Sequence, residues 1–323
     1  MSSDIILELQ NLKTYFPVKG SRTQFVKAVD GVSFQVKKGE TVGLVGESGC
    51  GKSTIGRTIM RFNQPTDGRI IFDGNDITTA DMKPYRQRMQ MVFQDPYSSL
   101  DPRMSVGDIV GEPLDIQSPK MNRRERYDRI LEQMKLVGLN SEQLSRFPHE
   151  FSGGQRQRIS IARAMVIKPE FLVLDEPVSA LDVSIQAQII NMLMDLQEQI
   201  GLAYLFIAHD LAVVRHISKT VVVMYLGHVM EINTAADLYQ HPLHPYTQAL
   251  LSAIPVPDPK TSRARKRQIL QGDVPSPINP PSGCVFSTRC PYATDACRHQ
   301  TPQVEDLGGG HKVACLRYKE IGG

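Results

Sequence analysis

The chain has 323 residues and a formal net charge of +3, and 41% of its residues are hydrophobic. This length accommodates one large domain with an extension, or two domains. No apolar run approaches the roughly 18 residues that a membrane-spanning helix needs, and the start lacks the features of a signal peptide. We therefore expect a cytoplasmic chain whose membrane role, if it has one, comes through a partner.

Composition also argues against two other classes of protein. The basic residues are spread along the chain, and the one dense basic run, 263–267, lies in a proline-rich stretch typical of a solvated linker. Nucleic-acid binding needs a concentrated basic face, so we expect no nucleic-acid partner. Five cysteines, four of them late in the chain, do not indicate a disulfide-stabilised secreted protein.

The N-terminal part of the chain predicts short strands around one helix. Residues 7–10 alternate apolar and polar side chains, as an edge strand does, and 19–27 predicts a turn. The apolar pattern of 53–62 predicts a helix. Strands are predicted at 5–15, 28–36, 41–45, 69–72 and 90–93.

The middle of the chain predicts a helical insertion followed by more alternating elements. Residues 95–150 carry several prolines and a helical stretch at 122–137. Further helices are predicted at 155–166 and 184–199, and buried strands at 171–174, 204–208 and 221–226. Strands that alternate with helices imply a mostly parallel sheet covered on both faces. Periodicity fades after about 242, so a domain boundary is predicted near 235–255.

The strongest motif is a glycine-rich loop between the predicted strand 41–45 and helix 53–62. It fits G-x-x-x-x-G-K-[ST] at every constrained position, and its predicted phosphate-binding residues are Gly46, Ser48, Gly49, Cys50, Gly51, Lys52, Ser53 and Thr54. Backbone N–H groups of such a loop converge on phosphate oxygens. Lys52 would reach the terminal phosphates and the Ser53 hydroxyl would hold Mg²⁺. A chance glycine-rich turn is the alternative, and the flanking strand and helix argue against it.

Three further groups of polar residues lie at element ends. Asp175 and Glu176 follow the strand 171–174, where an acid helps to hold Mg²⁺ and a second acid can activate water. His209 follows the strand 204–208, at the end of a parallel strand where open α/β sheets bind ligands. Ser152, Gly153, Gly154 and Gln155 open a helix and suit an anion site, although Ser152 and Gln155 also fit a plain capping box.

These residues, in this order, resemble the ATP-binding subunits of ABC transporters across roughly residues 5–240. The matching elements are 46–54, Gln94, 152–155, Asp175 with Glu176, 179–182 and His209, while Phe151 stands where leucine is usual. The resemblance implies an α/β phosphate-loop NTPase core of ABC type with antiparallel edge strands and an inserted helical subdomain at about 95–165. The implied domains are an ATP-binding domain at 1–240 and an irregular, cysteine-containing C-terminal extension at 241–323.

The same resemblance implies how the site works. Two such domains face each other head to tail, and each ATP lies between one phosphate loop and the partner's 152–155 segment. It gives Glu176 the role of catalytic base, His209 the contact to the γ-phosphate and Gln94 the contact to Mg²⁺. It also gives Asp182 a place at the dimer interface. An aromatic side chain of the first strand stacks on adenine, and position along the chain favours Phe16, with Tyr15 next.

Later segments narrow the resemblance to oligopeptide and dipeptide uptake systems. They are 244–251, 275–277 and the late cysteines, and 93–103 points to the second ATPase subunit of such a system. This subunit would work with a homologous ATPase or a second copy of itself, two transmembrane permease subunits and, indirectly, a peptide-binding protein. It would lie peripherally on the cytoplasmic side of the membrane. Nickel, glutathione or another small solute is an alternative cargo, and a soluble ABC ATPase without transport function is a second alternative.

The four late cysteines form a candidate metal site. Cys284, Cys290, Cys297 and Cys315 are separated by five, six and seventeen residues. Zinc sites usually show closer pairs, whereas the wider spacing suits a 4Fe-4S cluster, which the family resemblance also suggests. We expect such a cluster to be a structural staple, with zinc or free buried cysteines as alternatives.

Overall fold

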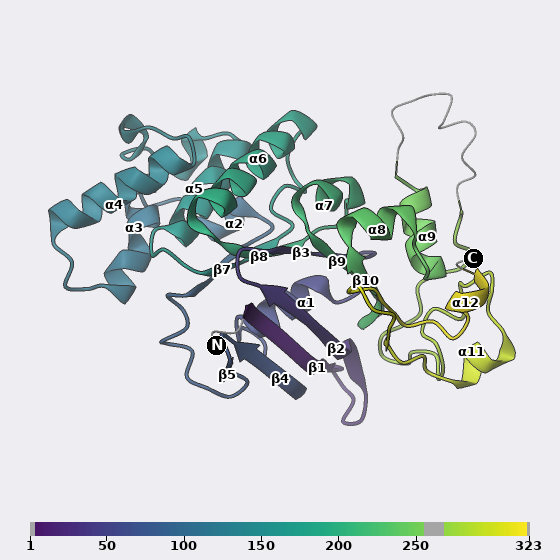
Figure 1. Cartoon of the computed structure of the whole chain (residues 1–323). Coiled ribbons are helices and arrows are strands. Elements are labelled where there is room, and N and C mark those ends of the chain that lie inside the picture. The colour runs from purple at the N-terminus through teal and green to yellow at the C-terminus, as the bar shows by residue number, and fades with distance from the viewer. Residues whose placement is uncertain (1–3, 255–267, 322–323) are drawn as a thin grey trace, which may run out of the picture.

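The computed structural model describes residues 4–254 and 268–321 (Figure 1). The basic run 263–267, predicted to be a linker, lies outside the described residues. Within them, no helix is both long and apolar enough to cross a membrane. The helices and strands interleave along the chain into two sheets, a helical layer and a C-terminal extension.

The core is a mixed eight-stranded sheet with the strand order β11-β12-β10-β9-β3-β8-β7-β6. The five strands from β9 to β6 in this order run parallel, and β10, β12 and β11 continue the sheet with antiparallel pairings. The bounds are β3 (Thr41–Val45), β6 (Met89–Val92), β7 (Phe171–Asp175), β8 (Ala203–Ile207), β9 (Thr220–Tyr225), β10 (His228–Thr234), β11 (Glu305–Asp306) and β12 (Lys312–Val313).

Both faces of this sheet are buried, which explains its continuous apolar strands. Alternate residues of one strand belong to different cores, because Leu172 and Leu174 pack with the helical layer while Phe171 and Val173 pack toward the second sheet. The helices on the first face are α5 (Gly153–Met165), α6 (Val183–Ile200), α7 (Leu211–Ile217) and α8 (Ala235–Gln240). Helix α1 (Lys52–Ile59) lies on the opposite face (Figure 1).

A four-stranded antiparallel sheet covers α1 from the other side, in the order β2-β1-β4-β5. Its strands are β1 (Ile5–Pro17), β2 (Phe25–Lys37), β4 (Asp67–Phe72) and β5 (Asn75–Asp76). The prediction of an edge strand at 7–10 was wrong, because β1 pairs with both β2 and β4. Its alternation over 7–10 arises because Leu7 and Leu9 are buried while Glu8 and Gln10 are partly exposed. The predicted turn also ends earlier, since Phe25 already pairs with Pro17.

The predicted insertion is helical and contains more helix than the sequence indicated. Its elements are α2 (Pro96–Ser99), α3 (Val106–Gln117), α4 (Arg123–Leu136), and the 3-10 turns η1 (Ser141–Gln143) and η2 (Pro148–Glu150). Helix α3 was not predicted because Pro113, which usually ends a helix, lies inside it. The Ser105 hydroxyl accepts a hydrogen bond from the Asp108 N–H and caps its start.

The C-terminal extension packs on the core and joins its sheet. It contains α9 (Pro245–Ser252), α11 (Asp295–His299) and α12 (Tyr318–Ile321), in addition to the two short strands β11 and β12. Strand β12 pairs with β10, where Glu231 lies opposite Val313. The buried Glu231 carboxylate accepts hydrogen bonds from the Leu243 and His244 N–H groups and contacts the His311 ring at 2.8 Å. The extension and the core therefore share one sheet, and a division at 240/241 stays a prediction.

Candidate active site

The glycine-rich loop connects β3 to α1 and requires glycine at two positions. Gly46 and Gly51 have φ angles of 154° and 104°, a region that side chains disfavour. A Cβ atom would lie 2.2 Å from the Met224 carbonyl oxygen at Gly46, and 2.1 Å from the Ala28 carbonyl oxygen at Gly51. The loop is therefore wedged between β2 and β9, and both contacts fix its path.

Lys52 occupies the hollow of this loop. Its side chain is buried, and its Nζ donates to the Gly46 carbonyl at 2.8 Å and to the Glu47 carbonyl at 3.1 Å. The Cys50 sulfur lies 3.7 Å from the same ammonium. Burial raises the pKa of the Cys50 thiol, with Lys52 opposing the shift, so Cys50 is a packed thiol and not a nucleophile.

Ser53 and Asp175 form the oxygen-rich part of the site. The Ser53 hydroxyl donates to Asp175 Oδ1 at 2.7 Å, and Asp175 is buried at the end of β7. Burial raises the Asp175 pKa, and the Ser53 hydrogen bond opposes this rise. A cation at this point would favour the ionised carboxylate. A hydroxyl and a carboxylate are the hard oxygen ligands that Mg²⁺ prefers, so the donor set fits that ion.

Three side chains from the ends of neighbouring parallel strands meet beside the loop. Gln94 Nε2 donates to Glu176 Oε2 at 2.7 Å, and His209 Nδ1 lies 3.6 Å from the same oxygen. Glu176 has φ 47°, a strained angle for a residue with a side chain. Its N–H donates to the Ile207 carbonyl at 2.9 Å, which fixes the strained backbone. The carboxylate is thus held between an amide and an imidazole.

Together these groups surround a cavity of about 490 Å³. It is lined by Ala28, Ser48, Gly49, Gly51, Lys52, Ser53, Thr54, Gln94, Glu176 and His209. Most of the residues predicted from the motif therefore converge. Gly46, Cys50 and Asp175 lie behind the lining, where they shape the loop and hold Ser53.

The segment 152–155 lies outside this cavity. Ser152 and Gln155 form the predicted capping box, because the Ser152 hydroxyl accepts from the Gln155 N–H and Gln155 Oε1 accepts from the Ser152 N–H. A Cβ at Gly154 would lie 2.4 Å from Ile185 Cγ2, so this glycine lets α5 approach α6. Ser152 and Gly153 are exposed. One chain alone does not bring this segment to the phosphate loop.

The predicted adenine-stacking residue also lies outside the cavity lining. Phe16 is partly exposed and pairs with Val26 near the β1–β2 turn. The alternative, Tyr15, donates its hydroxyl to Asp30 at 2.6 Å. Burial, followed by this hydrogen bond, raises the Tyr15 pKa. Tyr15 is therefore committed to a contact within the chain, and the role of Phe16 stays a prediction.

The sequence did not reveal that side chains of the C-terminal extension contact the phosphate loop. Arg289 donates to the Glu47 carboxylate through both terminal nitrogens, at 2.6 and 3.1 Å. The Tyr246 hydroxyl accepts a hydrogen bond from the Glu47 N–H at 2.9 Å. Glu47 occupies an unconstrained position of the motif, and no local pattern marks Arg289 as its partner. The ion pair between Glu47 and this distant arginine is apparent only from the three-dimensional structure.

The late cysteines come near one another without forming a metal site in this geometry. Cys284, Cys290, Cys297 and Cys315 are free thiols. Burial raises the Cys284 pKa to about 11, with smaller contributions from the other three. Among the described residues, no group of three or more His, Cys, Asp or Glu side chains is placed to hold a metal ion. The metal prediction therefore has no support from the side-chain positions.

Two family models match the chain. The model for the ABC transporter family matches residues 29–179, and the model for the oligopeptide/dipeptide transporter C-terminal region matches residues 230–297. The first match contains most of the cavity lining, and the second contains most of β10, the whole of α9 and three of the four late cysteines.

Close relatives span almost the whole chain. The chain is 53% identical to the oligopeptide transport ATP-binding protein AppF of Bacillus subtilis (strain 168), over 98% of each protein. It is 50% identical to the oligopeptide transport ATP-binding protein OppF of Salmonella typhimurium (strain LT2), over 97% of this chain and 96% of that protein. Among solved structures, the dimeric ATP-binding cassette MJ0796 bound to ADP and phosphate is 28% identical, with a TM-score of 0.65. It covers 71% of this chain, and 99% of that structure is matched.

Proposed function

The chain belongs to the ABC transporter family, and we propose that it is the ATP-hydrolysing subunit that powers import of di- and oligopeptides through a membrane transporter. One observation carries the proposal: Lys52, Gln94, Glu176 and His209 meet at one cavity, in a chain that resembles oligopeptide transport ATP-binding proteins over nearly its full length. The similarity to a solved ABC cassette supports the fold, and the match to the ABC transporter family model supports the ATPase activity.

ATP would bind with its phosphates in the glycine-rich loop. The N–H groups of the loop and the N-terminus of α1 provide the anion site. Lys52 would exchange its contacts to the Gly46 and Glu47 carbonyls for phosphate oxygens. Mg²⁺, when bound through the Ser53 hydroxyl and the Asp175 carboxylate, neutralises phosphate charge. Gln94 would contact that ion, and Phe16 would stack on adenine.

Glu176 would be the general base for attack of water on the γ-phosphate. The water loses its proton to the carboxylate as its oxygen bonds to phosphorus, and the bond from phosphorus to the bridging oxygen of ADP breaks. Gln94 holds the carboxylate by a hydrogen bond, and His209, whose Nδ1 lies 3.6 Å from the same carboxylate, would contact the γ-phosphate. The strained backbone at Glu176 supports a fixed, functional orientation.

A second ATPase domain would complete the site. The exposed start of α5 presents Ser152 and Gly153 away from its own cavity, which is the arrangement that a head-to-tail partner needs. The dimeric structure of MJ0796 supports this assembly. Asp182 is exposed at the start of α6 and would lie at the same interface. The partner would be a second copy or a homologous subunit.

The remaining partners would be two permease subunits and, through them, a peptide-binding protein. The chain would then lie on the cytoplasmic side of the membrane without entering it. Nickel or another small solute is the alternative cargo. Uptake of labelled peptide and of nickel, measured on the assembled transporter, distinguishes these cargoes, and ATP hydrolysis that is uncoupled from every solute would instead favour a non-transport ATPase.

We also propose that Cys284, Cys290, Cys297 and Cys315 hold a 4Fe-4S cluster, with Zn²⁺ as the alternative. The proposal rests on the spacing of the four cysteines and on the match of residues 230–297, which include three of them, to the oligopeptide/dipeptide transporter C-terminal region. When bound, the cluster would supply a covalent staple for the extension. Protein purified without oxygen should contain about four iron atoms per chain. Iron-free protein with one zinc would support the alternative ion.

A further inference from the structure

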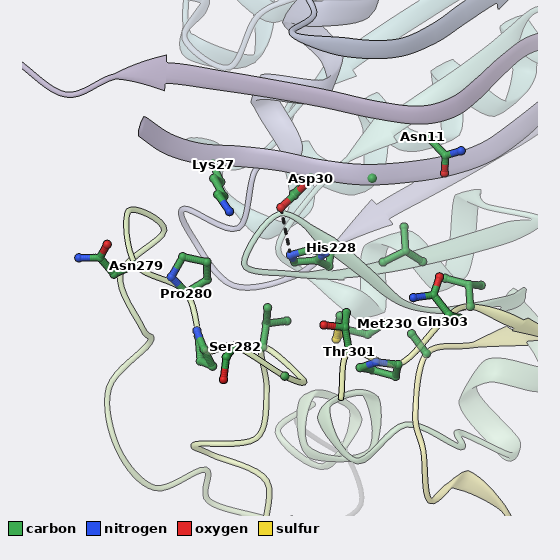
Figure 2. Close-up of a pocket in the computed structure, with 18 of the residues that line it drawn as sticks. Asn11, Lys27, Asp30, His228, Met230, Asn279, Pro280, Ser282, Thr301 and Gln303 are labelled. Carbon is green, nitrogen blue, oxygen red and sulfur yellow. Dashed lines mark ion pairs between the residues drawn. The ribbon is translucent and has the colours of Figure 1, made fainter. Parts of the chain in front are cut away.

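A cavity of about 660 Å³ lies between the β1–β2 hairpin, the start of β10 and the C-terminal extension (Figure 2). Its volume falls within the range of roughly 300–1,000 Å³ that is usual for small-molecule sites. Its walls come from β2 and β10 on one side and from the extension segments 278–283 and 301–304 on the other. None of the residues proposed to bind ATP lines it.

Opposite charges meet at one end of this cavity. Figure 2 shows Lys27, Asp30 and His228 directed toward the same space. Lys27 contacts the Tyr15 ring, with Nζ 6.0 Å from its centroid, and forms no ion pair with Asp30. Asp30 accepts the Tyr15 hydroxyl with Oδ1, while its Oδ2 lies 4.0 Å from His228 Nε2. An ammonium and a carboxylate oxygen are thus both available to a ligand.

The His228 imidazole beside Asp30 does not neutralise either charge. Burial lowers the His228 pKa, and Lys27 adds to this effect while Asp30 opposes it. His228 is therefore a neutral hydrogen-bonding group at neutral pH. The remaining lining is mixed. Thr301 and Gln303 provide polar groups, while Ile278, Val285 and Val304 provide apolar contacts.

We propose that this cavity binds a small zwitterion, an amino acid or a dipeptide, whose carboxylate pairs with Lys27 and whose ammonium pairs with Asp30. Both pairs are charge-assisted and partly shielded from water, which makes them stronger than surface pairs. The apolar part of the cavity wall accommodates a side chain of the ligand without selecting for a particular one. The inference concerns a second site of the ATPase subunit, outside the path of the transported solute.

The cavity wall is continuous with the phosphate loop. The Asp30 N–H donates to the Gly227 carbonyl, and the Gly227 N–H donates to the Cys50 carbonyl, both at 2.9 Å. The Lys27 N–H donates to the Pro277 carbonyl of the extension at 3.0 Å. A ligand that bridges Lys27 and Asp30 would therefore restrain the same turn that supports Cys50. We expect it to change the ATP dissociation constant by at least about fivefold, the lower end of typical coupling between sites.

The test is calorimetric titration of the nucleotide-free, full-length protein with alanyl-alanine. Saturable one-to-one binding is expected, and the N-acetylated and the C-terminally amidated dipeptides should each bind at least tenfold more weakly. Asp30→Asn should remove the preference for the free ammonium, and Lys27→Met the preference for the free carboxylate. The control pair is Lys13→Met and Asp67→Asn, a solvent-accessible ion pair of the same sheet that does not line the cavity.

Three results would overturn the inference. They are no saturable binding at millimolar dipeptide, equal binding of free and blocked dipeptides, or binding that both cavity variants leave unchanged. Because the blocked dipeptides are tested on the unaltered protein, a variant that fails to fold does not remove the test. The titration needs no ATP hydrolysis, so its failure is distinguishable from failure of the proposed transport function.

Discussion

Arg289 and Glu47 form a bidentate ion pair that joins the C-terminal extension to the phosphate loop, with nitrogen–oxygen distances of 2.6 and 3.1 Å. The Arg289 side chain is only 8% exposed, and it also lies over the Tyr225 ring. The backbone N–H of Glu47 donates a hydrogen bond to the Tyr246 hydroxyl, which also belongs to the extension. The extension is thus a structural support of the nucleotide site.

Arg289→Met should weaken ATP binding more than it slows turnover. The substitution leaves the Glu47 carboxylate partly buried without its partner, so the loop loses a fixed orientation. We expect the KM for ATP to rise about tenfold with a smaller change in kcat, as measured by steady-state hydrolysis. Arg103→Met is the matched control, because its ion pair with Asp101 is exposed. The Glu47→Gln, Arg289→Met double variant should lose less than the sum of the two single variants, and strict additivity would contradict the coupling.

Gly51→Ala should abolish nucleotide binding, whereas Gly49→Ala should be milder. Both glycines have positive φ angles, but a Cβ at Gly51 would lie 2.1 Å from the Ala28 carbonyl oxygen, and a Cβ at Gly49 would meet nothing within 4 Å. Gly49→Ala carries only the backbone strain, of about 1–2 kcal/mol. Fluorescent-nucleotide titration checks the order. Equal losses for both variants would show that the contact with β2 does not fix the loop.

His244 should make the stability of the protein depend on pH. It is buried at the start of α9, where Nδ1 accepts from the Tyr246 N–H at 3.0 Å. Burial lowers its pKa to about 3 from the model-peptide value of 6.5. The unfolded state then binds the proton more readily, so stability is fully present above about pH 6.5 and declines as the pH falls toward 3.

Protonation of His244 alone should lower the free energy of unfolding by up to about 1.4 kcal/mol per pH unit below about pH 6. His244→Asn keeps a capping acceptor and should flatten the dependence of the unfolding free energy on pH. Urea unfolding between about pH 5 and 7 measures this dependence. His299→Asn, at an exposed position, should leave the slope unchanged. An unchanged slope in the His244 variant would contradict the assignment.

The sequence predicted the α/β core because its signals are local. The apolar strands 171–174, 204–208 and 221–226 and the loop at 46–54 each carry their own pattern, and all were confirmed as elements of the fold. Helix α3 was missed because Pro113 masks its period. The packing of α3 on α5 within the helical layer outweighs the helix-breaking tendency of Pro113.

The rest of the site depends on contacts between distant segments. Strands β11 and β12 have two residues each, so they have no period of their own. Strand β12 exists only through its pairing with β10, and β11 through its pairing with β12. The ion pair of Glu47 with Arg289 likewise joins residues far apart in the sequence. Spacing of the four cysteines suggested a cluster, but spacing cannot fix the distances among thiols on irregular loops.

The most direct test of the account is peptide uptake by the assembled transporter carrying Glu176→Gln. The amide keeps the hydrogen-bonded position beside Gln94 but cannot accept the proton of water. ATP binding should remain, while ATP hydrolysis and ATP-dependent peptide uptake should both fall by about 10²–10⁴-fold. Glu198→Gln, at an exposed position of α6, should leave both unchanged. Unaltered hydrolysis and uptake in the Glu176→Gln transporter would contradict the claim that this site powers peptide import.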